Sequence, residues 1–132
     1  MVVVQALVIY GLLAVVLISV EILFTYATRG FGFGFSANRP EVEKSGLALR
    51  IQRTYRNHVE AGSYIVPILA AAAFLGLERP GVEFAAHLII IGRLGFAVTY
   101  YTGISFIRVP FFVLGSVPSL YIGFIALAQL MA

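Results

Sequence analysis

Four long apolar segments, separated by short stretches rich in Gly, Pro and charge, leave this chain few ways to fold. An α-helix needs about 20 mainly apolar residues to cross the hydrocarbon core of a bilayer. We place the segments at residues 2–28, 46–76, 82–107 and 111–131. The sequence therefore predicts an all-α fold, an integral membrane four-helix bundle that forms one domain over residues 1–132.

The composition supports this interpretation and excludes several others. The chain is 61% hydrophobic and only 11% charged, whereas about a quarter of the residues in a soluble domain are charged. The net charge of +3 is small and scattered, which argues against a nucleic-acid partner. Because the chain has no Cys, it offers no disulfide framework, thiolate ligand or cysteine nucleophile. His58 and His87 have no second ligand at metal-binding spacing, and we expect no metal site.

Breaker residues mark the boundaries between the segments. Residues 29–44 combine alternating Gly and Phe with Pro and charge, which predicts a loop. We expect the second helix to start near Ser45. Arg108 and Pro110 mark a break before the last segment, in which Pro118 should kink the helix or free a carbonyl. The first segment lacks a basic leader, so we expect a retained span rather than a signal peptide.

Positive charge is concentrated on one side of the predicted bundle. Cytoplasmic loops of membrane proteins carry an excess of Lys and Arg. The second loop holds only Arg79, so we expect both termini outside and the first and third loops in the cytoplasm. The compactness of the chain is typical of bacterial proteins, which would place it in a bacterial inner membrane. The cations on the predicted cytoplasmic side are Arg29, Arg39, Lys44, Arg50, Arg53, Arg56 and Arg108.

A polar face on the second helix is the strongest functional signal. Steps of three and four place Arg50, Arg53, Asn57 and Glu60 on one face. Ionisable groups at membrane depth are costly and usually mark a ligand or ion site. Guanidinium, amide and carboxylate groups together suit a small zwitterionic ligand with several carboxylates. The alternative is a solvated helix start in which Arg56 and Glu60 pair at i,i+4.

The third segment carries a second constellation. Arg93, Phe96 and Tyr100 share one helical face. An arginine in the middle of a span needs a partner, because burial without one costs several kcal/mol, of the order of 2–7. That partner is either a ligand or a carboxylate such as Glu21 or Glu60. For Glu21 itself we expect an ion pair with an arginine of the second helix.

Arg108 also has two interpretations. A cation at the end of the third helix is favoured by the helix dipole. Alternatively, Arg108 lies beside a bound thiol and stabilises its thiolate, since a nearby cation lowers a thiol pKa from about 8.5. With no Cys in the chain, that thiol must come from a ligand.

The spacing of Arg50, Arg53, Arg56, Asn57 and Glu60 resembles the second-helix signature of the MAPEG family, the membrane-associated proteins in eicosanoid and glutathione metabolism. An arginine followed seven residues later by a tyrosine in the third segment supports the resemblance, which covers nearly the whole chain. The resemblance implies a homotrimer with the second helix near the three-fold axis. It also implies glutathione bound between neighbouring protomers and open to the cytoplasm.

Carried over by position, the resemblance assigns a glutathione site and a catalytic residue. Arg108 would hold the thiolate, although its spacing from Tyr100 fits the relatives only with a small shift, and Phe96 stands where some relatives have tyrosine. The residues assigned to glutathione binding are Arg29, Arg50, Arg53, Arg56, Asn57, Glu60, Arg93 and Tyr100.

The function that follows is a membrane glutathione transferase or peroxidase. Its partners would be lipids, glutathione as co-substrate and hydrophobic electrophiles that enter from the bilayer. The family also contains a non-enzymatic lipid-binding member, so the alternative is a lipid-binding or scaffold protein of the same fold. A small transporter or channel subunit is a third reading, for which only Arg93 and Glu21 are deep charges.

Overall fold

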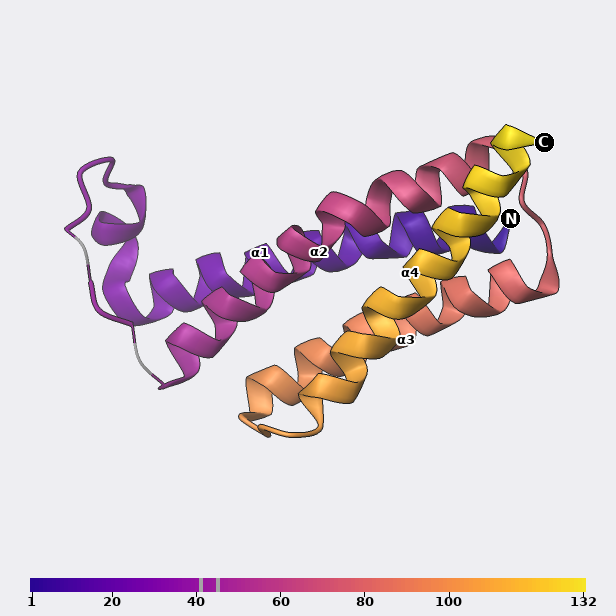
Figure 1. Ribbon diagram of the computed structural model, residues 1–132. Helices are drawn as coiled ribbons and strands as arrows, with labels where there is room; N and C mark the ends of the chain where they lie inside the picture. Colours follow the sequence, from indigo (N-terminus) through magenta and orange to yellow (C-terminus); the bar gives the residue numbers. More distant parts are fainter. Residues whose placement is uncertain (41, 45) are drawn as a thin grey trace.

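The computed structural model describes residues 1–40, 42–44 and 46–132, and four helices account for most of them. They are α1 (Val2–Phe35), α2 (Gly46–Phe74), α3 (Pro80–Thr102) and α4 (Arg108–Met131) (Figure 1). The described residues contain no strand, which confirms the predicted all-α class. Three of these helices, α1, α3 and α4, are long and apolar enough to cross a membrane. Although α2 has 29 residues, its polar first half lowers its mean hydropathy.

The end of α1 differs from the predicted loop. The helix breaks at Gly30, whose φ of 81° and ψ of 165° suit glycine alone. The chain is then helical again as far as Phe35, so the prediction of a loop is wrong over this turn. A side chain on Gly34 would collide with the Tyr26 ring, so the small residue lets Tyr26 pack against the turn. The predicted helix start near Ser45 lies outside the described residues.

The junction between α3 and α4 also departs from prediction. The third segment was expected to reach residue 107, but α3 ends at Thr102 because Gly103 adopts a left-handed φ of 78° and caps the helix. Helix α4 starts at Arg108 and includes Pro110 in its first turn, where a missing N–H costs nothing. Arg108 thus lies at a helix N-terminus, and the predicted dipole stabilisation at a C-terminus is wrong.

The helices form two antiparallel pairs, α1 with α2 and α3 with α4 (Figure 1). Both α2 and α3 contact three other helices, whereas α1 and α4 do not touch each other in the described part of the chain. The connections α1–α2 and α3–α4 lie at one end, and both termini lie at the other (Figure 1). A buried apolar core fills the space between the helices, with its centre at Ile65, Leu69, Ile89 and Ile122.

A glycine in α3 allows a close contact between α3 and α4. A side chain on Gly92 of α3 would collide with the backbone of Leu114 and Gly115 in α4. Small residues let helix backbones approach closely in lipid, where packing rather than water exclusion drives association. This contact constrains the register between α3 and α4 next to Arg93, which follows Gly92 in the chain.

Candidate functional site

Helix α2 has polar residues on two opposite faces. Thr54 and His58 point into the bundle and are buried, with exposed fractions of 0% and 1%. Arg53, Arg56 and Glu60 are exposed on the other side, which we call the outer face of α2. Because Arg53 and Glu60 are seven residues apart, two helical turns bring them to the same face. The outer face therefore projects out of the protomer into its surroundings.

The outer face contains one ion pair. Arg56 Nε lies 3.0 Å from Glu60 Oε1, which confirms the predicted i,i+4 pair. Both side chains are mostly exposed, and such pairs contribute only about 0.3–0.5 kcal/mol. Arg53 has no hydrogen bond or ion pair with any residue that the structure describes. The face thus combines one paired carboxylate with an excess of guanidinium.

Arg93 of α3 is the most deeply buried charge in the described residues, with an exposed fraction of 1%. Its Nη2 donates a hydrogen bond to Asn57 Oδ1 at 2.8 Å, and its guanidinium lies 4.9 Å from the centre of the Phe96 ring. It pairs with neither Glu21 nor Glu60, so that interpretation is wrong. The bond occupies the oxygen of Asn57 and turns the amide NH₂ of this half-buried residue away from Arg93.

The inner face of α2 is tied to α1 by a pair that sequence reasoning missed. Tyr10 Oη donates to the His58 carbonyl at 2.6 Å, and His58 Nε2 lies 3.0 Å from the Tyr10 carbonyl. Because a carbonyl only accepts, Nε2 carries the proton. The two rings stack with centres 4.0 Å apart. His58 therefore connects α1 and α2. In the sequence, the only sign of this role is that His58 is a polar residue next to the arginines of the second helix.

A second group of arginines gathers where α3 ends. Arg50 Nε donates to the Tyr101 carbonyl at 3.2 Å. The Arg108 guanidinium lies 4.7 Å from the centre of the Tyr100 ring, within the range of a cation–π contact. An arginine of α2 and an arginine of α4 thus contact adjacent residues of α3. The fold brings together Tyr100 and Arg108, which were predicted to serve one site.

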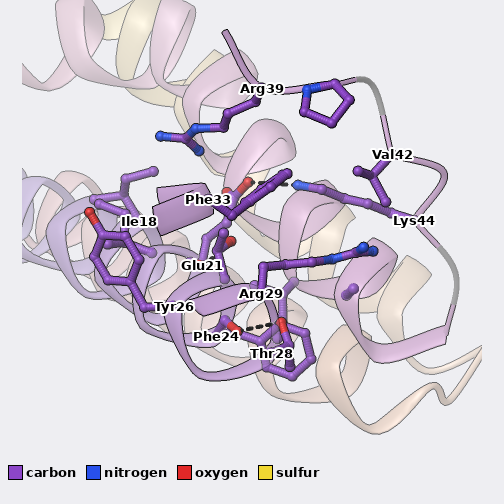
Figure 2. Close-up of a pocket in the computed structure, with 15 residues that line it drawn as sticks. Ile18, Glu21, Phe24, Tyr26, Thr28, Arg29, Phe33, Arg39, Val42 and Lys44 are labelled. Atoms are coloured by element: carbon purple, nitrogen blue, oxygen red, sulfur yellow. Dashed lines mark hydrogen bonds and ion pairs between the residues drawn. The ribbon is translucent and has the colours of Figure 1, made fainter. Parts of the chain in front are cut away.

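Arg29 lies elsewhere, in a pocket of about 440 Å³ formed by the end of α1, the following loop and the start of α2 (Figure 2). In the same pocket Glu21 pairs with Lys44 at 3.5 Å. The prediction that Glu21 pairs with an arginine of the second helix is therefore wrong, because the loop before α2 brings Lys44 to this carboxylate. Ile51, a buried residue on the inner face of α2, lines this pocket. The pocket therefore lies on the inner side of α2, away from the outer face.

The sequence model of the MAPEG family matches residues 6–128 of the 132-residue chain. The chain belongs to the MAPEG family. With three apolar helices of membrane-spanning length, this MAPEG protein is an integral membrane protein in contact with lipid. The family generally uses glutathione, and its members include glutathione transferases as well as other proteins. No curated protein and no solved structure matches the chain at a significant level.

This MAPEG chain thus divides its predicted site residues among four places. Arg53, Arg56 and Glu60 are on the outer face of α2. Asn57 and Arg93 form the bond between α2 and α3. Arg50, Tyr100 and Arg108 lie in the arginine group at the end of α3. Arg29 lies in the pocket at the end of α1.

Proposed function

We propose that this MAPEG protein is a membrane glutathione transferase or peroxidase that acts on hydrophobic electrophiles from the bilayer. The observation that carries the proposal is the outer face of α2. There Arg53 and Glu60 are exposed next to Asn57, whose amide is oriented by a buried arginine. Charged groups in a membrane helix that are not used within the protomer point to a ligand.

The groups on the outer face match glutathione one by one. Guanidiniums bind carboxylates through paired hydrogen bonds, which suits Arg53 for the carboxylates of the tripeptide. Glu60 suits its ammonium group, and the free NH₂ of Asn57 suits an amide carbonyl. Arg56 adds positive charge on the same face, and Arg50, which bonds to the Tyr101 carbonyl, adds it one turn before Arg53. Arg93 acts here as a positioning residue, because its burial leaves no surface for contact with a ligand.

A second copy of the chain would complete this site. The outer face is open in one protomer, so glutathione bound there is covered only if α2 faces a neighbour. A homotrimer with α2 near its axis meets this need and leaves α1, α3 and α4 to face lipid. Arg29 would reach this ligand only from a neighbouring protomer, because its own pocket lies on the inner side of α2.

Arg108 is the proposed catalytic residue. A thiol with a pKa of about 8.5 is mostly protonated at neutral pH, and a guanidinium beside the sulfur favours the thiolate. Arg108 sits over Tyr100 at 4.7 Å, which holds its charge at the end of α3. The thiolate would attack the electrophilic carbon, form a C–S bond and expel the leaving group. Positive charge placed in advance at the sulfur is the main catalytic device.

A lipid-binding or scaffold protein of the same fold is the second candidate. It is favoured by the internal pairing of Arg56 with Glu60 and of Arg93 with Asn57, because groups satisfied within the protomer need no ligand. Glutathione bound without turnover of any electrophile would support this function over a transferase.

Calorimetric titration of the detergent-purified protein with glutathione tests the proposal. We expect saturable binding in the native chain, and loss of binding in Arg53→Ala and Glu60→Ala. Arg79→Ala is the matched control, because this exposed arginine lies in the connection between α2 and α3, at the opposite end of the bundle, where its side chain bonds to Gln129. Absence of binding in the native chain would remove the transferase function and leave the scaffold function. Equal weakening in the control would show that surface charge alone is responsible.

A further inference from the structure

The pocket at the end of α1 belongs to neither the outer face of α2 nor the arginine group at the end of α3. Its volume of about 440 Å³ lies in the range of about 300–1,000 Å³ that is typical of ligand pockets. Its walls come from the second half of α1, the loop after it and the first two turns of α2 (Figure 2). It is therefore a separate cavity whose occupant has to be argued from its own lining.

One end of the pocket is strongly positive. Figure 2 shows Arg29, Arg39 and Lys44 arranged around Phe33. The Arg29 and Arg39 guanidiniums lie 5.9 and 5.7 Å from the centre of that ring. Glu21 is the only carboxylate among the described lining residues, and it is already paired with Lys44 at 3.5 Å. Two guanidinium charges thus remain uncompensated within the described lining.

Backbone carbonyls hold one of these cations in place without neutralising it. Arg39 donates from Nη2 to the Gly34 carbonyl at 2.6 Å and from Nε to the Ser36 carbonyl at 3.2 Å. These carbonyls belong to the turn created by the break at Gly30. A guanidinium fixed in this way can still bind an anion through its remaining N–H groups.

Apart from the Glu21–Lys44 pair, the rest of the lining is mainly apolar. Ile18 and Ile22 lie one turn apart on α1, and Ile51 faces them from α2. At 1.5 Å per residue, about 16 Å of helix separates Ile18 from Arg29. Tyr26, Phe31 and Phe35 stack against one another next to the charged end, as aromatic residues do at a membrane–water interface. The lining therefore carries its unpaired cations toward the end of α1 and most of its apolar side chains one to three turns earlier on this helix.

We propose that this pocket binds an anionic amphiphile, a phospholipid whose phosphate lies at the Phe33 end within reach of Arg29 and Arg39. One acyl chain would then lie against Ile18 and Ile22. A charged head at the interface and an apolar chain below it match the order of the lining residues. The site does not depend on glutathione binding, and it gives Arg29 a ligand within its own protomer.

Native mass spectrometry of the detergent-solubilised protein with defined lipids tests this site. We expect phosphatidylglycerol to be retained at least about fivefold more than phosphatidylcholine, a difference of about 1 kcal/mol. Glycerol 3-phosphate, which has the charge but no chain, should not be retained. Equal retention of the two lipids would overturn the anionic head, and glycerol 3-phosphate bound as well as the lipid would overturn the apolar half.

Variants locate the binding. Arg39→Gln and Arg29→Gln should each reduce the preference for phosphatidylglycerol, and the double variant should abolish it. Arg79→Gln, at the opposite end of the bundle, should keep it. An unchanged preference in the double variant would overturn the proposed site. Glutathione titration of the Arg39→Gln variant verifies its fold. A native chain that binds the lipid but no glutathione would refute the proposed glutathione function and leave the lipid site standing.

Discussion

Both faces of α2 carry polar side chains, but those of the inner face are bonded within the protomer and those of the outer face are exposed. On the inner face, His58 exchanges two hydrogen bonds with Tyr10 and is fully enclosed. On the outer face, Arg53 is exposed and unbonded to any described residue, and Glu60 has only a weak exposed partner. A polar residue in a membrane helix therefore stabilises the fold when its partner is in the protomer. Without such a partner, it marks a surface that something else must cover.

The largest expected effect separates chemistry from folding. Arg108→Ala should lower the turnover number about 100- to 1,000-fold, as removal of one charge-stabilising group typically does, and leave glutathione affinity and the melting temperature nearly unchanged. Steady-state kinetics with varied glutathione, beside calorimetry, measures both quantities. An equal loss of rate and affinity would place Arg108 in ligand binding instead of thiolate stabilisation.

The inner face should respond in the opposite way. His58→Ala should destabilise the protein by about 2–4 kcal/mol, because it leaves a cavity and removes the N–H that the Tyr10 carbonyl accepts. Tyr10→Phe is the milder matched change, since it keeps the stacked ring and removes one hydrogen bond, at about 1 kcal/mol. Thermal unfolding in detergent measures the loss. A His58 variant with native stability and impaired glutathione binding would reverse the roles assigned to the two faces.

Arg93 connects the faces, and its substitution sharpens the comparison. Arg93→Met keeps the volume and removes the bond to Asn57, so glutathione affinity should fall about tenfold, or about 1.4 kcal/mol. Stability should be kept, because an apolar side chain replaces a buried charge. Adding Asn57→Ala should cause no more loss than Asn57→Ala alone. Additive losses would mean that Arg93 touches the ligand itself.

The smallest effect concerns the outer ion pair. Arg56→Ala should change the free energy of unfolding by less than about 0.5 kcal/mol, because an exposed i,i+4 pair is screened by water. Unfolding without glutathione, at low and high salt, measures this value. A loss above about 1 kcal/mol would show that the outer face also holds the protomer together.

The number of helices and the common face of Arg53 and Glu60 follow from the sequence alone, because long apolar runs and steps of three and four are local properties. The helix ends were harder to predict. The mainly apolar residues 104–107 hid the end of α3, which the left-handed Gly103 determines. Arg108 was consequently assigned to the end of one helix when it starts the next.

Contacts between helices depend on register, which no local pattern contains. The close approach at Gly92 constrains how α3 packs against α4, and the packing of α3 against α2 brings Arg93 to Asn57 and to neither candidate carboxylate. Likewise, the turn after Gly30 brings Lys44 to Glu21 in place of an arginine of α2. The candidate site was therefore predictable as a set of residue types, but not as a set of contacts.

The modest hydropathy of α2 has a consequence for how the protein is made. Helices α1, α3 and α4 are apolar enough to enter the bilayer independently, whereas α2 emerges from the ribosome second with its arginines uncovered. The bonds between Tyr10 and His58 would retain it beside α1 at that stage. Arg93 reaches Asn57 only after α3 has been synthesised. Helix α2 would thus be held in the bilayer first by α1 and then by α3, the two helices to which its polar residues bond.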